Sequence, residues 1–430
     1  MTEAVSPAAP PADPSLGTAP PPERIATLDI LRGVAVMGIL AMNIVAFSMP
    51  FQAYMNPLAY GLESQADLAS WLVGFILVDG KMRGFFSFMF GASTLLVIES
   101  AEAAGRSPAR AHYARMLWLL VFGLLHFYLI WFGDILAAYA LCGLVLYAFR
   151  DLSVRALVAW GIALAALQLA LFGLMSLSIF MLAQATALPD ARAETLRAWQ
   201  DMQRDFGGTE EAIAASLALY RGDYAGILNE RLTSMAAMPF VNTLLFGAET
   251  LGYMVLGMGA FKSGFFRGTW EAARYRKWAV TGFAVALPVY ALFAWILLDD
   301  GFSVPMVFGI AMGATGLVRP VMVMALAALV ILLTRRGGAL ADRIAAAGRA
   351  AFTNYLGTSI LMTTLFYGYG LGLYGQLSRI ELWLPVLGVW ALMLLWSKPW
   401  LDRFRYGPFE WLWRSLARWE LQPMRRSGVQ

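Results

Sequence analysis

The strongest constraint on the fold is a series of long apolar runs separated by short polar or basic segments. Of the 430 residues, 60% are hydrophobic and 14% are charged, and the mean hydropathy is +0.63. Soluble domains are about half apolar and about a quarter charged. Runs of about 20 apolar residues can span a bilayer, and continuous runs exclude an alternating outer-membrane barrel. The sequence therefore predicts an all-α, polytopic integral membrane helical bundle.

The distribution of Lys and Arg predicts the topology. These residues lie in alternate loops, which places both termini in the cytoplasm. The segment 67–79 is short for a span, and we expect it to be interfacial or re-entrant. We predict about ten transmembrane helices, at residues 28–48, 82–100, 116–132, 135–149, 154–184, 239–261, 277–298, 303–334, 351–371 and 382–397.

The composition along the chain divides it into three parts. Residues 1–22 contain seven prolines and no Lys or Arg, which predicts a disordered cytoplasmic tail. Residues 24–397 form the bundle, including an extracytoplasmic helical insertion at 185–238. Residues 398–430 alternate aromatic rings with Arg, as in an amphipathic cytoplasmic interfacial segment. The run 303–334 contains Gly309, Gly313, Gly316 and Pro320, so we expect this helix to tilt or break.

Several classes of site are excluded by composition. Cys142 is the single cysteine, so neither a disulfide framework nor a cysteine metal site can form. The two histidines fall on opposite sides of the membrane, so we expect no metal site, and we expect His112 to be solvated. The pI of about 9.1 reflects cytoplasmic loops and does not indicate nucleic-acid binding.

Titratable groups within spans are costly and therefore mark candidate sites. His126 lies in the apolar run FGLLHFYLIWFGDIL, in the outer half of its span. It can act as a general base or as a packed hydrogen-bond donor. Asp134 would lie about 12 Å away along one helix. The two side chains can meet only if the chain turns back at Gly133, or through a substrate.

Further polar side chains lie at the start of the first and ninth spans. Asp29, Arg32 and Asn43 share a face about 60° wide. Asp29 could instead cap the helix while Arg32 reaches the headgroups, but Asn43 lies too deep to do so. Asn354 lies in GRAAFTNYLGTS. Interhelical hydrogen bonding explains it, and lining a polar cavity is the alternative.

Three basic residues are unusual for their positions. Lys81 and Arg83 lie at the outer end of the second span, where Asp79 would pair with one of them. The other needs a carboxylate or an anionic ligand. Arg319, in GLVRPVM, cannot deprotonate and needs water, a carboxylate or an anion. We give a structural pair with Asp134 or Asp79 the same weight as substrate binding.

Several blocks of the sequence resemble a known family. They include LDILRGVAVMGILAMN, DGKMRGFFSFMFGA, RMLWLLVFGLLHFYLIWFGDILAAYALCG and GPFEWLWRSLARWELQPMRR. These blocks resemble the YeiB-like family of bacterial inner-membrane proteins, in order over about residues 24–426. That family is distantly similar to transmembrane acyltransferases of the heparan-α-glucosaminide N-acetyltransferase type. Asp29, Arg32 and Gly33 match their D-x-x-R-G opening. His126 resembles their membrane-embedded histidine in residue type and setting, but it does not lie in a motif that aligns with theirs.

The resemblance implies a multi-pass inner-membrane acyltransferase. Acyl-CoA, such as acetyl-CoA, would be the cytoplasmic donor, a sugar or lipid the extracytoplasmic acceptor, and no metal would be needed. His126 would be the general base with Asp134 beside it. Expected partners are membrane lipids and the acceptor, not nucleic acid, and a homodimer is left open. A transporter or lipid-handling protein without covalent chemistry is the alternative. Residues expected to bind substrate are Asp29, Arg32, Asn43, Lys81, Arg83, Arg319 and Asn354.

Overall fold

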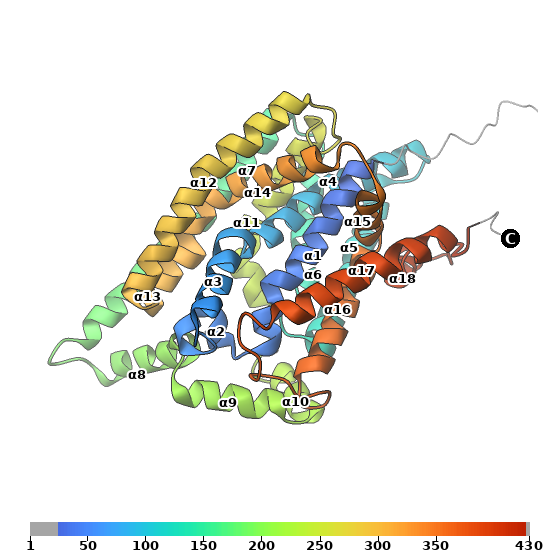
Figure 1. Ribbon diagram of the computed structural model, residues 1–430. Coiled ribbons are helices and arrows are strands. Elements are labelled where there is room, and N and C mark those ends of the chain that lie inside the picture. Colours follow the sequence, from blue (N-terminus) through green and yellow to red (C-terminus); the bar gives the residue numbers. More distant parts are fainter. Residues whose placement is uncertain (1–24, 427–430) are drawn as a thin grey trace, which may run out of the picture.

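The computed structural model describes residues 25–426, whose ordered elements are helices packed side by side (Figure 1). Within this range, eight helical segments are long and apolar enough to cross a membrane. This confirms the predicted all-α polytopic bundle. The eight are α1 (Ala26–Ser48), α3 to α4 (Gln65–Ala103), α5 with η3 (Pro108–Ile130), α7 (Val154–Thr186), α11 (Met238–Lys262), α12 (Ala272–Asp300), α13 to α14 (Val304–Thr334) and α17 (Trp383–Arg403).

Two of the ten predicted spans form shorter helices. The span expected at 135–149 is α6 (Leu136–Leu146), continued by η4 (Tyr147–Phe149). The span expected at 351–371 is α16 (Ala351–Phe366). The count of ten spans and the cytoplasmic placement of the termini stay predictions, and the predicted tail at 1–22 lies outside the described residues.

The segment expected at 67–79 forms a helix directly before the second span. After the short α2 (Phe51–Met55) and η1 (Pro57–Ala59), α3 (Gln65–Val73) continues into the π-helix η2 (Gly74–Val78). The chain then turns at Gly80, where φ is 67°, and α4 (Lys81–Ala103) begins. A side chain at Gly80 would lie 2.6 Å from Nε of Arg319, so this turn fits only glycine. The interfacial or re-entrant placement of residues 67–79 stays a prediction.

The predicted interruption of the 303–334 run takes the form of a π-helix. The short α13 (Val304–Met306) leads into η6 (Val307–Ala314), and α14 (Thr315–Thr334) follows with Pro320 inside it. A π-helix has i→i+5 hydrogen bonds, and such segments within helices are frequent at functional sites. Arg319 lies five residues beyond the end of this π-helix.

Close backbone contacts at glycines position α1 within the bundle. A Cβ atom on Gly33 would lie 2.1 Å from the carbonyl oxygen of Ile344, in α15 (Ala339–Arg349). A Cβ atom on Gly348 would lie 1.9 Å from the carbonyl oxygen of Asp29. Small residues allow such close helix crossings in membranes. The glycine in the LDILRG block is therefore required by the α1–α15 contact.

The two remaining parts of the chain pack against the ends of the bundle. The insertion at 185–238 forms a helical cap, at the lower end in Figure 1. In the C-terminal part, α18 (Pro408–Arg418) packs on α5 and α16, and Trp413 Nε1 donates to the Arg115 carbonyl at 3.0 Å. The cap consists of α8 (Ala193–Met202), η5 (Gln203–Gly207), α9 (Glu210–Arg221) and α10 (Tyr224–Leu232).

The α1–α15 contact predicts a strong effect of one methyl group. Gly33→Ala should lower the free energy of unfolding by about 1–3 kcal/mol, because the new Cβ meets backbone that cannot move aside. Gly357→Ala on α16 is the matched control, since a Cβ there meets nothing within 4 Å. Thermal unfolding in detergent measures both. Equal stability of the two variants would contradict the close contact.

Candidate functional site

His126 and Asp134 form a buried hydrogen-bonded pair. The π-helix η3 (His126–Ile130) ends α5, and the chain then turns back through Gly133. His126 Nδ1 lies 2.8 Å from Asp134 Oδ1, and both side chains are 1% exposed. The other carboxylate oxygen accepts from the Ala137 amide at 2.8 Å, within the first turn of α6. The turn at Gly133 named from the sequence therefore brings the two side chains together.

The second ring nitrogen of His126 has no hydrogen-bond partner among residues 25–426. Its ring lies 5.2 Å from that of Tyr355 and 6.4 Å from that of Trp131, which stacks on Phe47 at 3.8 Å. A carboxylate at Asp134 can only accept a hydrogen bond, so in the neutral form of the ring Nδ1 is the donor of this pair. Nε2 then presents a free lone pair, as a general base requires.

Glu249 on α11 forms a second buried polar centre, which the sequence interpretation missed. Its carboxylate accepts from Arg83 Nη2 at 2.5 Å and forms an ion pair with Arg319. The Tyr253 hydroxyl donates to it at 3.1 Å, and Arg319 also donates to Thr315 Oγ1 at 2.6 Å. The predicted partners of Arg319, Asp134 and Asp79, are therefore wrong. A carboxylate within the apolar run 239–261 was the signal that could have identified Glu249.

Asp79 forms no ion pair within 4 Å with Lys81 or Arg83, both of which are among the described residues. The predicted local pair is therefore also wrong. The turn at Gly80 separates the side chains on its two sides. Lys81 Nζ donates to the Phe75 carbonyl and lies 3.5 Å from the centre of the Tyr290 ring. Asp79 instead accepts from the Tyr54 hydroxyl at 2.5 Å.

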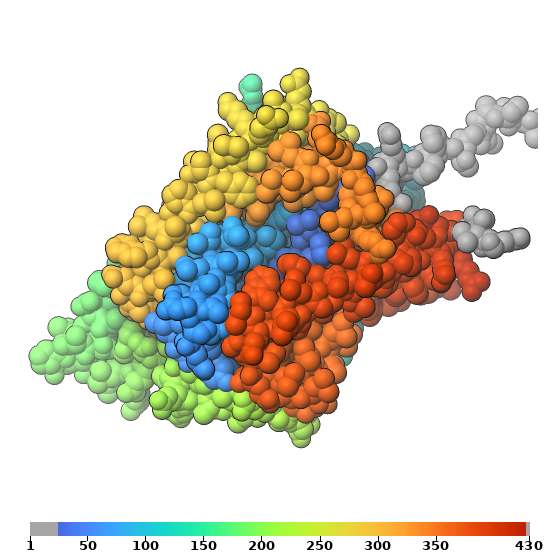
Figure 2. All heavy atoms as spheres, in the orientation of Figure 1, coloured from blue at the N-terminus to red at the C-terminus, as the bar shows by residue number. Residues whose placement is uncertain are grey.

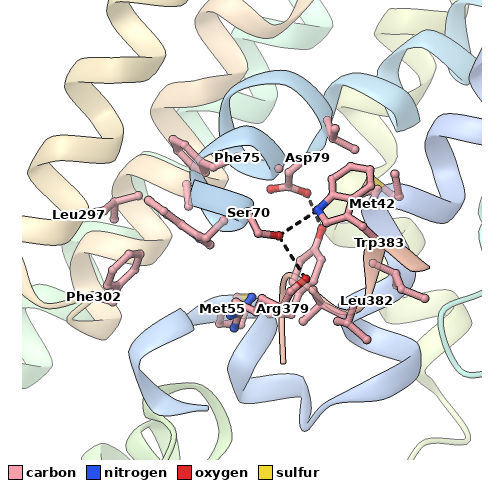
Figure 3. Close-up of a pocket in the computed structure, with 18 residues that line it drawn as sticks. Met42, Met55, Ser70, Phe75, Asp79, Leu297, Phe302, Arg379, Leu382 and Trp383 are labelled. Atoms are coloured by element: carbon pink, nitrogen blue, oxygen red, sulfur yellow. Dashed lines mark hydrogen bonds between the residues drawn. The ribbon is translucent and has the colours of Figure 1, made fainter. Parts of the chain in front are cut away.

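A cavity of about 90 Å³ lies beside Asp79, between α1, α3 with η2, α12 and residues 379–383 (Figure 3). Its walls are mostly apolar. Ser70 Oγ donates to the Arg379 carbonyl at 3.2 Å and accepts from Trp383 Nε1 at 3.0 Å. Burial lowers the pKa of Arg379 to about 10, so its guanidinium stays charged at neutral pH. The cavity can hold a small polar group with an apolar neighbour.

The surface is also hollowed on the face drawn in Figure 2. Atoms of α1 lie at the bottom of this hollow, between the light-blue, orange and red segments. The helix that carries Asp29, Arg32 and Asn43 is thus flanked by helices from both halves of the chain.

Tyr139 on α6 connects the two buried centres. Its hydroxyl donates to the Arg83 carbonyl at 2.9 Å and lies 2.6 Å from Ser87 Oγ. Asp134 precedes the same helix by two residues. The short α6 therefore contacts the His126 pair at its start and the α4 backbone beside the Glu249 centre farther along.

The remaining predicted site residues lie elsewhere in the bundle. Arg32 pairs with Asp29 at 3.1 Å and donates to Ser93 Oγ at 2.8 Å, near the start of α1. Asn43 is buried deeper in the same helix. Asn354 donates to the Ala347 carbonyl at 3.0 Å and accepts from an indole N–H of α17, so it bridges helices.

His112 is buried, which corrects the prediction that it is solvated. It is 1% exposed, and its Nε2 lies 2.8 Å from the Gly143 carbonyl oxygen. The cause is that α5 begins at Pro108, earlier than expected, so that residue 112 falls within the helix. Among the described residues, no group of three or more His, Cys, Asp or Glu side chains could hold a metal ion.

The Glu249 centre predicts a large cost for removing one charge. Glu249→Gln should destabilise the protein by about 3–5 kcal/mol, because the buried guanidinium of Arg319 and the partly buried one of Arg83 lose their carboxylate. Glu99→Gln, which removes an exposed pair with Arg267, should cost at most about 1 kcal/mol. Unfolding in detergent measures both. In a double-mutant cycle, Arg319→Met should recover part of the loss, and strict additivity would contradict the pairing.

Comparison with known proteins identifies the family. Residues 260–420 match the family described as protein of unknown function (DUF418). The chain is 32% identical over 421 residues to the Bacillus subtilis protein YxaH, covering 94% of this chain and 96% of YxaH. It is 33% identical over 410 residues to Escherichia coli YeiB, covering 92% and 96%. Both relatives are described as uncharacterized, and no solved structure matches. The chain therefore belongs to the YeiB-like family of multi-pass membrane proteins.

Proposed function

We propose that the protein is an acyltransferase of the bacterial inner membrane. It would transfer an acyl group from cytoplasmic acyl-CoA, such as acetyl-CoA, to a hydroxyl or amine of an extracytoplasmic sugar or lipid. The observation that supports this most is the His126–Asp134 pair, whose Nε2 lacks a partner among residues 25–426. A buried imidazole oriented by a carboxylate is the arrangement that acyl-transfer enzymes use to activate a nucleophile.

The reaction requires one proton acceptor and no metal. Nε2 of His126 removes the proton from the acceptor hydroxyl as its oxygen attacks the thioester carbonyl. The tetrahedral oxyanion then collapses, the carbon–sulfur bond breaks, and the CoA thiolate takes the proton from the imidazolium. Asp134 holds the ring in one tautomer and stabilises its charged form. Because this carboxylate is also fixed by the Ala137 amide, the orientation of the imidazole is set before substrate binds.

The buried cations would stabilise the oxyanion. Arg83 and Arg319 together carry one positive charge more than the Glu249 carboxylate that they share. This excess lies in an apolar environment, where it attracts developing negative charge more strongly than in water. We assign stabilisation of the oxyanion to Arg83 or Arg319, and contacts with the substrate to Lys81.

The remaining polar residues of α1 and α16 would act on the substrates less directly. Asp29 and Arg32 lie at the predicted cytoplasmic end, where the donor enters, and Asn43 lies deeper along the same helix. Asn354 joins α16 to the neighbouring helices, so its contribution would be to hold the substrate-binding helices in place.

Replacing the base should abolish transfer. In proteoliposomes containing bacterial lipid extract and acetyl-CoA, His126→Ala should reduce CoA thiol release about 10²–10⁴-fold, the usual contribution of a general base. Asp134→Asn should also reduce the rate, because the amide no longer fixes the tautomer. His112→Gln is the matched control, since that ring already bonds to Gly143. Undiminished release by His126→Ala, at equal protein content, would rule out this mechanism.

A second candidate function rests on the cavity beside Asp79. Its mostly apolar walls and few polar groups suit part of a lipid, which fits a transporter or lipid-handling protein without covalent chemistry. Mass spectrometry of co-purifying ligands separates the two functions. Bound CoA supports acyl transfer, whereas an intact lipid alone, with no acylated product, supports lipid handling.

A further inference from the structure

Arg231 is a fully buried cation in the helical cap. It lies on α10 and is 1% exposed. Its Nη1 donates to the Tyr128 carbonyl at 3.4 Å, whereas Nε and Nη2 have no partner among the described residues. No carboxylate of residues 25–426 lies within ion-pair distance of it, and even its sequence neighbour Glu230 does not pair with it. The guanidinium is therefore removed from solvent, and a single long hydrogen bond to a neutral carbonyl is all that replaces the water.

A buried charge in this state is expensive. Removing a guanidinium from water costs several kcal/mol unless a counter-ion and hydrogen bonds replace the solvent. Arginine cannot reduce this cost by losing its proton. The planar fork of Nε and Nη2 is also the geometry that binds a carboxylate or phosphate with two parallel hydrogen bonds. The two unpartnered nitrogens of Arg231 are therefore suited to an anionic ligand.

The surroundings of Arg231 are aromatic. Tyr220 and Tyr367 lie close enough for the charge of Arg231 to act on their hydroxyl groups, and the centres of the two rings are 4.9 Å apart. Burial raises the pKa of Tyr220 to about 12, and the Arg231 charge acts in the opposite direction. The Tyr367 hydroxyl has no hydrogen-bond partner among the described residues. Phe132 lies 5.9 Å from Tyr220, so this aromatic cluster reaches the turn between His126 and Asp134.

The cap is fastened to the π-helix that carries His126. The Tyr224 hydroxyl donates to the Leu129 carbonyl at 2.8 Å, and the Tyr128 hydroxyl donates to the Ala236 carbonyl at 2.6 Å. Trp131 Nε1, directly after this helix, is a further buried donor without a partner in the described part of the chain. Two side chains with unpartnered donors, Arg231 and Trp131, thus lie beside the segment that presents the free Nε2 of His126.

We propose that the cap and the 126–134 turn bind an anionic group of the ligand, a phosphate or carboxylate, with Arg231 as its counter-ion and the Tyr367 hydroxyl and Trp131 indole as further donors. The assignment of this ligand to the acceptor rests on the proposed acyltransferase function. The acceptor would then carry a negative charge near the hydroxyl or amine that His126 activates. The same chemistry is offered by a soluble phosphorylated or carboxylated compound and by the headgroup of an anionic lipid.

Anion-dependent thermal unfolding tests this site without requiring catalysis. Wild-type protein in phosphatidylcholine nanodiscs is heated with glycerol 3-phosphate, glycerate or neutral glycerol, at ionic strength matched with NaCl. We expect one of the two anions to raise Tm by at least about 2 °C and glycerol to leave it unchanged. Nanodiscs containing phosphatidylglycerol form the lipid arm. Stabilisation there alone identifies a lipid headgroup, and stabilisation by a soluble anion identifies a soluble ligand.

Variants assign the effect to Arg231. Arg231→Met should lose the anion response and, without ligand, be at least as stable as wild type, because an uncompensated charge is removed. Arg197→Met is the matched control, since that cap arginine is exposed and should keep the full response. Arg231→Lys keeps the charge without the fork and should respond more weakly than wild type.

Two results would overturn the site. One is an equal anion response in Arg231→Met and wild type. The other is a wild-type protein whose Tm responds to neither anion and not to phosphatidylglycerol. His126→Ala should keep the response, so a failure of acyl transfer and a failure of anion binding are distinguishable.

Discussion

One carboxylate, Glu249, joins three helices that are distant in sequence. It accepts hydrogen bonds from Arg83 on α4 and Arg319 on α14, while its own helix, α11, packs against α4 and α7. In an apolar environment none of the three charges is tolerable alone, and together they still carry a net positive charge. The relative placement of these helices is therefore fixed by electrostatics as well as by packing. The short α6 is in turn held to α4 through Tyr139.

The His126 pair depends on this frame. His126 begins the π-helix η3, after which the chain reverses at Gly133 and enters α6. The position of the imidazole therefore depends on the position of α6. Asp134 acts on both sides of the reversal, since one oxygen holds the ring and the other caps the helix. A structural cap and an orienting carboxylate are thus the same residue. This explains how a buried base can be rigid in a segment that contains a tight turn.

Sequence patterns were sufficient for the class of fold, and they identified His126 and Asp134 as candidates without fixing how the two side chains meet. Hydropathy located the apolar helices, because every backbone group in lipid must be satisfied within a helix. A turn at Gly133 was one of two predicted ways for His126 to meet Asp134, the other being a bound substrate, and the structure contains the turn. The partner of Arg319 was missed because Glu249 lies 70 residues away and pairing across a bundle leaves no local periodicity. His112 was misplaced because its helix starts within a basic segment that resembles a loop.

The π-helix η6 has a consequence for how α14 presents its side chains. Each π-helical residue advances less around the axis than an α-helical residue, so the length of residues 307–314 sets the angular direction of everything that follows. Arg319 follows this segment, and in the direction that results its guanidinium meets Glu249. The local helical pitch of an apolar segment without charged residues thus contributes to whether a cation five residues later faces a carboxylate or lipid. Relatives could redirect this charge by gaining or losing a single residue there, without altering the arginine.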